Sequence, residues 1–147
     1  MCLKSFSNII IKLAFLNSLF SLTIIMKQAT VYLLSAVILL ALDSIYLTLF
    51  SGYFDGQIRR VQGSPLKMNL MAAVMCYIFL IFGINYFILG PKKSVYDAFL
   101  LGLVIYGVYE TTTYALLKNW SFFTVVLDTL WGATLFALTT WIISMIR

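Results

Sequence analysis

The sequence predicts an all-α integral membrane protein: an up-down-up-down four-helix bundle with an extra apolar or amphipathic helix at its N-terminus. Of its 147 residues, 63% are hydrophobic and 10% are charged, against roughly 45–50% and 25% in soluble domains. The mean hydropathy is +1.01, and the apolar residues form long runs separated by short basic clusters. So few charged side chains cannot cover the surface of a soluble protein. We therefore expect a multi-pass protein in contact with the lipid bilayer.

The charges and cysteines exclude several classes of function. Ten basic residues outnumber five acidic ones, but they flank apolar runs, which favours membrane anchoring over a nucleic-acid partner. Cys2 and Cys76 lie far apart in the sequence, so they indicate neither a disulfide framework nor a pair of metal ligands. No histidine is present, which removes the usual residue for zinc sites and for acid–base catalysis. We therefore expect no metal, no cofactor and no assigned catalytic residue.

Four apolar runs are long enough to cross a hydrocarbon layer about 30 Å thick. The segment between the first two, residues 51–67, is rich in Gly, Pro and basic residues and predicts an interfacial loop with a short surface helix. Short connections make the spans alternate in direction, with both termini on one side. Lys4 and Lys12 tip a nearly even charge balance towards cytoplasmic termini. The predicted spans are residues 28–50, 68–89, 95–117 and 121–146, the last anchored by Arg147.

The first 25 residues are assigned separately, as an N-terminal extension before a four-span domain at residues 26–147. Their uninterrupted apolar run after Lys12 is only about 13 residues, short for a span. They fit an amphipathic surface helix, a fifth partial span, or an early start codon ahead of Met26. No small-residue cleavage site precedes Met26, so we favour the last two interpretations over a cleaved signal peptide.

Three acids lie inside the predicted spans, where a charge costs about 2.5–3.5 kcal/mol on insertion scales. At 1.5 Å per residue, Asp43, Glu110 and Asp128 lie roughly 18, 22 and 20 Å from the terminal side. The acids therefore converge on one level, and we expect them to point into the bundle.

Aromatic and hydroxyl side chains share the helix faces of these acids at three- and four-residue spacing. The stretches LDSIYL and LDTLWG also share the pattern Leu-Asp-x-x-aromatic on oppositely directed helices, a hint of an inverted repeat. The candidate polar binding site consists of Asp43, Glu110, Asp128, Tyr46, Tyr106, Tyr109, Thr113 and Trp131. We expect Trp120, Trp141 and Tyr53 to be interfacial aromatics, and Asp55 and Asp97 to be solvated.

Residues 26–146 resemble the membrane proteins grouped as domain of unknown function 2177. The resemblance implies a four-helix membrane protein of unassigned activity, and it leaves residues 1–25 outside the family core. This chain departs from the family pattern by having Tyr46 for Trp, Glu110 for Asp and Thr113 for Asn. The matching positions are Leu42, Asp43 and Leu47; Tyr106, Tyr109, Thr112, Leu117, Lys118 and Trp120; and Asp128, Trp131 and Gly132.

Three functional hypotheses follow. The first is a small transporter or permeation-type protein that binds a proton or a cationic or polar solute at the acids. Because four helices rarely enclose a pathway alone, this hypothesis predicts a homodimer or larger assembly.

The second is an intramembrane enzyme acting on a lipid or isoprenoid. The chain has no histidine cluster, Asp-rich metal motif or nucleophile elbow, so a non-enzyme is favoured. The third is a packing protein whose acids only hydrogen-bond between helices.

Overall fold

The computed structural model describes residues 2–146, and the side chains of residues 16–23 and 25–146. Over this part of the chain the fold is all-α, with five α-helices, one π-helical turn and no strand. Four helical segments in it are long and apolar enough to cross a membrane. The elements are α1 (Cys2–Leu49), α2 (Ser51–Gln62), α3 (Leu70–Ile84), η1 (Asn85–Leu89), α4 (Val95–Leu116) and α5 (Phe122–Ile146). The expected anchors Lys4, Lys12 and Arg147 lie outside the described side chains.

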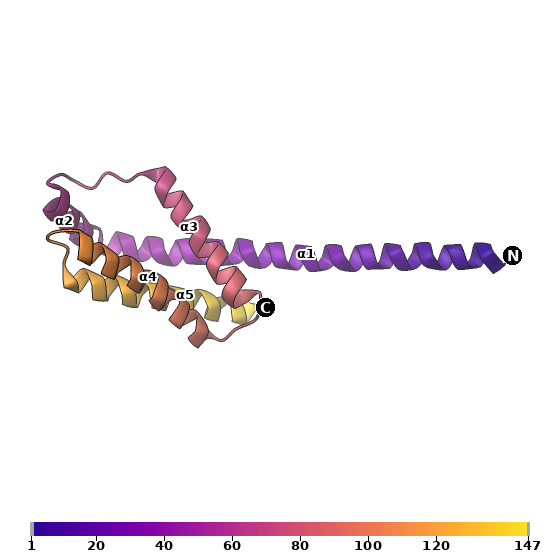
Figure 1. Cartoon of the computed structure of the whole chain (residues 1–147). Coiled ribbons are helices and arrows are strands. Elements are labelled where there is room, and N and C mark those ends of the chain that lie inside the picture. The colour runs from indigo at the N-terminus through magenta and orange to yellow at the C-terminus, as the bar shows by residue number, and fades with distance from the viewer. Residues whose placement is uncertain (1, 147) are drawn as a thin grey trace.

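α1 is a single helix of 48 residues, about 72 Å long at 1.5 Å per residue. The separate N-terminal helix expected from the sequence is instead continuous with the first span (Figure 1). No glycine or proline occurs between residues 1 and 50, so nothing in the sequence breaks the helix. The part of α1 long and apolar enough to span is Leu16–Leu49.

α2 is the short surface helix expected in the loop. Gly63 ends it in the left-handed conformation, at φ +72°, and donates its N–H to the carbonyl of Arg59. Asp55 accepts from the backbone N–H of Leu66 at 3.1 Å and pairs with Arg59 at 2.7 Å. These two contacts, the Leu66 N–H first, hold the pKa of Asp55 below its ordinary value. The carboxylate therefore fastens the following loop to α2.

The remaining spans begin and end within two residues of their predicted bounds. Asn69 caps α3 by accepting from the N–H of Ala72, and Ser94 with Asp97 forms a capping box at the start of α4. Asp97 is therefore a capping residue at the helix edge. The π-helical turn η1 precedes Pro91, which ends the span because it has no backbone N–H.

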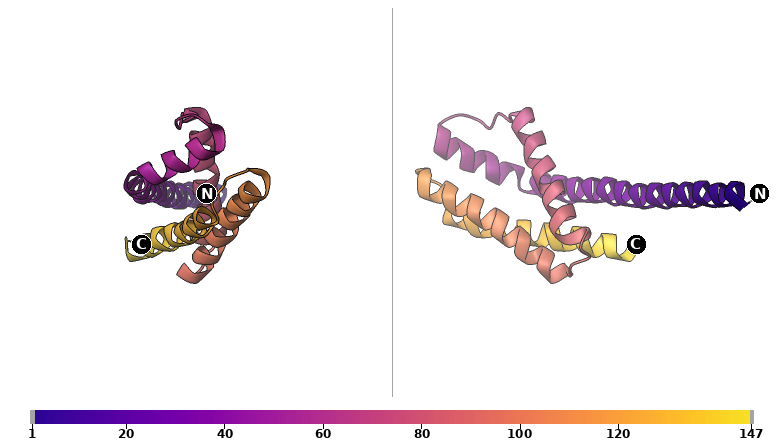
Figure 2. Two further views of the ribbon diagram at one scale, coloured as in Figure 1. Left: turned by 90° about the vertical axis from the view of Figure 1, so that its left-hand side faces the viewer. Right: turned by 45° about the vertical axis from the view of Figure 1, so that its right-hand side comes forward.

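The spans alternate in direction, and α4 and α5 form the closest pair (Figure 1). α1 lies beside α5, whereas α3 packs mainly on α1 and crosses it obliquely (Figure 2). All three buried residues of α3, Leu80, Gly83 and Ile84, lie in its second half. The first half of α3 therefore leans away from the other spans, so the four spans do not all pack along their full lengths.

Two glycines allow α4 and α5 to approach closely. A Cβ on Gly102 would meet the backbone carbonyl of Gly132 and, at 2.9 Å, the Cα of Ala133. A Cβ on Gly132 would overlap the ring of Tyr106. Small residues at helix contacts are a common device in membranes, and here they bring α4 and α5 together near the middle of the two helices.

Candidate intramembrane carboxylate site

The three acids lie at one level of the fold. Asp43 precedes the end of α1, Glu110 precedes the end of α4, and Asp128 follows the start of α5, in each case by six residues. These three helix ends lie at the same end of the molecule (Figure 1). Each carboxyl group is therefore roughly 9 Å along its helix from that end.

Asp43 joins three spans. Its side chain is 7% exposed, and its two oxygens accept hydrogen bonds from the hydroxyl of Tyr77 on α3 at 2.7 Å and from Nε1 of Trp131 on α5 at 2.8 Å. A buried carboxylate needs such donors, because leaving it unpaired in an apolar interior is costly.

Asp128 completes a reciprocal exchange with Asp43. The hydroxyl of Tyr46, three residues after Asp43, donates to Asp128 at 3.1 Å, while Trp131, three residues after Asp128, donates to Asp43. The rings of Tyr46 and Trp131 stack with centroids 4.4 Å apart and planes at 10°. The shared Leu-Asp-x-x-aromatic pattern thus forms a two-way clamp between the antiparallel helices α1 and α5, and this clamp is called the α1–α5 clamp below.

Glu110, on α4, is the acidic neighbour of Asp128. Its side chain is 1% exposed and accepts from Nε1 of Trp120 at 2.9 Å. The carboxyl groups of Glu110 and Asp128 are within hydrogen-bonding reach of each other, so the pair can share one proton. The sequence predicts an interfacial position for Trp120; in the structure Trp120 lies between the end of α4 and the start of α5, and its indole turns towards Glu110.

A cavity of about 350 Å³ opens beside these acids, between α1, α3, α4 and α5. Asp43 and Asp128 both line it, together with Tyr77, Tyr106 and Tyr109. Glu110 is not among the lining residues. The cavity therefore combines two carboxyl groups with three aromatic side chains, and its size falls in the range of small-molecule sites, about 300–1,000 Å³.

The other predicted residues divide into two groups. Tyr106 packs its ring against Gly132, and Tyr109 is 61% exposed at the edge of the cavity. Thr113 forms its hydrogen bond within its own helix and not with an acid: its hydroxyl donates to the carbonyl of Tyr109 at 2.8 Å. That local bond is a common alternative for a threonine within a helix.

Two cavity-lining residues that carry a hydroxyl or thiol group were not predicted from the sequence. Tyr77 and Cys76 lie on α3, in a stretch without any acid, so no helix-face pattern points to them. The one available signal is that Tyr77 is a hydroxyl-bearing residue in the middle of a very apolar span. Among the described residues, no group of three or more His, Cys, Asp or Glu side chains could hold a metal ion.

Four long apolar spans with buried acids define a polytopic helical membrane protein. Residues 28–145 match the family described as "Predicted membrane protein (DUF2177)", and the chain belongs to this family. No curated protein and no solved structure matches the chain. The matched residues contain the whole α1–α5 clamp, the Glu110–Asp128 pair and the cavity.

Proposed function

We propose that the protein is a small transporter or permeation-type protein that binds a monovalent organic cation at Asp43 and Asp128 and exchanges it for a proton. The observation that carries this proposal is the cavity of about 350 Å³ lined by both carboxyl groups. Acids inside a membrane are rare and commonly mark solute or proton pathways. We assign this function to residues 26–147, spanning the membrane up-down-up-down with cytoplasmic termini.

The chemistry of the lining favours an organic cation over an inorganic one. A carboxylate supplies the opposite charge, and the faces of tyrosine rings attract cations. Tyr77, Tyr106 and Tyr109 supply such rings around the acids. An inorganic ion would instead need several oxygen ligands around one point, whereas both oxygens of Asp43 already accept bonds from Tyr77 and Trp131.

The Glu110–Asp128 pair supplies the proton. When the pair shares one proton, arrival of a cation beside Asp128 favours release of that proton, since the cation replaces it as the neutralising charge. Glu110 lies between Asp128 and Trp120, which follows the end of α4, so the proton would leave towards that membrane surface. Because α3 packs mainly on α1, a single chain encloses the cavity incompletely, and the proposal includes a homodimer or larger assembly.

The exchange can be tested with purified protein in vesicles that contain a trapped pH-sensitive dye. A gradient of benzyltrimethylammonium, a small aromatic cation, should drive proton movement in the opposite direction. Glu110→Gln should retain cation binding but release no proton, because the amide donates to Asp128 and carries no titratable proton. If correctly folded wild-type protein moves neither the cation nor protons, the transport proposal is wrong.

A second candidate function is acid–base catalysis on a lipid or isoprenoid. Two carboxyl groups within hydrogen-bonding reach, one of them lining a largely apolar cavity, favour it. Deletion should then change the cellular lipid profile, and Asp128→Asn should reproduce that change. An unchanged lipid profile would remove the support for this candidate.

The α1–α5 clamp also fits a purely structural role, in which the acids only hold helices together. This alternative predicts that Asp128→Asn and Glu110→Gln have no functional effect, because an amide retains most of the hydrogen bonds. A loss of cation binding in a normally folded variant separates the two interpretations.

A further inference from the structure

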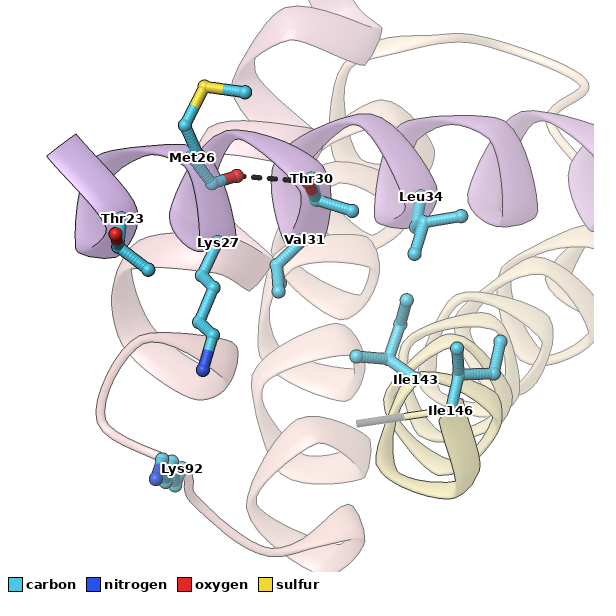
Figure 3. A pocket seen from close by; sticks show the side chains of 9 residues that line it. All are labelled: Thr23, Met26, Lys27, Thr30, Val31, Leu34, Lys92, Ile143 and Ile146. Atoms are coloured by element: carbon cyan, nitrogen blue, oxygen red, sulfur yellow. Dashed lines mark hydrogen bonds between the residues drawn. The ribbon is translucent and has the colours of Figure 1, made fainter.

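A second cavity lies at the opposite end of the spans from the acids. Its volume is about 570 Å³, and it is bounded by α1, the turn between η1 and α4, and the end of α5. Lys27 and Lys92 line one part, while Val31, Leu34, Ile143 and Ile146 line another (Figure 3). Among the residues whose side chains the structure describes, no acid lines it.

The cavity lies at the level of a membrane surface. Lys27 precedes the end of α1 by 22 residues, which is roughly 33 Å of helix and close to the thickness of the hydrocarbon layer, about 30 Å. The end of α5 and the turn between η1 and α4 lie at the same end of the four spans, and α1 continues beyond it (Figure 1). The lysines therefore occupy the headgroup level, and the apolar part of the cavity extends towards the hydrocarbon.

The two lysines come from separate elements and line the same cavity. In Figure 3 Lys27 points from α1 towards the turn that carries Lys92, and both lysines lie to one side of Ile143 and Ile146. The ion pair found in the described part of the chain, Arg59 with Asp55, involves neither of them. Two ammonium groups beside an apolar wall match a ligand with an anionic head and a hydrocarbon tail.

The turn that carries Lys92 is well defined. Lys92 adopts the left-handed conformation, at φ +56°, which residues other than glycine rarely adopt. Hydrogen bonds from the N–H groups of Gly90 to Asn85 (2.8 Å) and of Lys93 to Ile88 (2.9 Å) hold this turn. An adjoining cavity of about 300 Å³ shares Lys92 and Ile143 and is also lined by Lys93. A third lysine therefore extends the basic rim.

We propose that this cavity binds an anionic phospholipid. Its phosphate lies between Lys27 and Lys92, and an acyl chain lies along Val31, Leu34, Ile143 and Ile146. A lipid bound there bridges α1 to the turn before α4 and to the end of α5. The site is separate from the carboxylate cavity, with which it shares no lining residue.

The test is lipid retention by the purified full-length chain, measured by native mass spectrometry from an equimolar mixture of phosphatidylglycerol and phosphatidylcholine. Wild-type protein should retain phosphatidylglycerol preferentially. Lys27→Gln combined with Lys92→Gln should reduce that preference about tenfold, because each lysine contributes to attraction of the anionic lipid. The matched control, Lys67→Gln with Lys118→Gln, removes two exposed lysines elsewhere and should leave the preference unchanged.

Two further arms separate a lipid from a free anion. Ile146→Gln keeps every charge and alters the apolar wall at a residue that is 60% exposed, so it should weaken retention severalfold without unfolding the protein. Millimolar inorganic phosphate should not displace the lipid. An equal loss in the control double variant, unchanged retention in Ile146→Gln, or displacement by inorganic phosphate would each overturn the proposal.

Discussion

Tyr46 and Trp131 stack face to face, with ring centroids 4.4 Å apart, and each donates a hydrogen bond to the aspartate on the other's helix. This exchange joins α1 and α5 through two aromatic rings and two carboxyl groups. It also fixes Asp43 and Asp128 at the wall of one cavity. The contacts that stabilise the fold therefore position the candidate binding groups.

Tyr46→Phe should lower the free energy of unfolding by about 1 kcal/mol, because it removes one intramembrane hydrogen bond and keeps the ring. The measurement is unfolding in mixed micelles with increasing denaturing detergent. Tyr96→Phe, at a side chain that is 67% exposed, is the matched control and should change little. In a double-mutant cycle with Trp131→Phe, we expect a coupling free energy above about 0.5 kcal/mol. Strict additivity would contradict the clamp.

The glycine contacts predict that replacing glycine by alanine has opposite effects on stability at two positions. Gly102→Ala should destabilise the fold by several kcal/mol, because its methyl group meets the backbone of Gly132 and Ala133, which cannot move independently of α5. Gly56→Ala in α2 meets nothing within 4 Å and should stabilise the helix by roughly 0.5–1 kcal/mol. Thermal unfolding of both variants checks this, and equal effects would be inconsistent with close packing of α4 and α5.

Gly132→Ala should act on the cavity, because its methyl group would occupy the position of the Tyr106 ring. Tyr106 lines the cavity, so displacing its ring should weaken the binding of benzyltrimethylammonium. The effect should exceed that of Tyr109→Phe, because this variant keeps the aromatic ring at position 109. Isothermal titration of both variants provides the comparison. Unchanged affinity in a folded Gly132→Ala protein would show that Tyr106 does not contribute to binding.

Cys76 provides a direct probe of cavity occupancy because it lines the same cavity. In a Cys2→Ser background it is the sole cysteine, and its reaction with a small thiol reagent should slow when benzyltrimethylammonium is bound. The matched control moves the thiol by one residue, with Cys76→Ser and Met75→Cys; Met75 is 51% exposed and does not line the cavity. Protection at both positions would argue against a specific site.

Asp55 predicts a local pH dependence outside the membrane. Its pKa is lowered in the folded state, so its stabilising contacts are fully present above the unfolded value of about 3.9 and are lost as pH falls through the folded value. Hydrogen exchange in the loop after α2 should therefore accelerate, relative to the intrinsic rate, below about pH 4. In Asp55→Asn this acidic transition should disappear, and its persistence would assign it to another group.

The spans and the acids could be predicted from the sequence because apolar runs, Gly90–Pro91 and basic clusters are local signals. Which donor bonds to which acid could not be predicted, although Tyr46 and Trp131 belong to the predicted site. Tyr77 lies 34 residues from Asp43, and Trp131 lies 88 residues from it, so those bonds depend on how far each helix is rotated and how the helices cross. Thr113 shows the opposite limit: its spacing places it near Glu110, but its hydroxyl bonds to its own helix.

The continuity of α1 was also missed, for a physical reason. Membrane thickness suggests where a span should begin, near residue 28, but thickness does not end a helix; only breakers or caps do. No glycine or proline precedes Gly52, and α1 runs unbroken to Leu49. The π-helical turn at Asn85–Leu89 likewise has no local signature beyond the proline that follows it.

The central claim is that the carboxyl groups in the cavity bind a cation, and Asp128→Asn tests it most directly. The asparagine can still accept from Tyr46 and can donate to Glu110, so the fold should be preserved. The measurement is the affinity of protein in lipid nanodiscs for benzyltrimethylammonium and for neopentylbenzene, its uncharged isostere. We predict that wild-type protein prefers the cation and that Asp128→Asn weakens cation binding at least about tenfold while leaving the isostere unaffected. Equal affinity of wild-type protein for the two probes, or unchanged cation affinity in folded Asp128→Asn, would contradict the account.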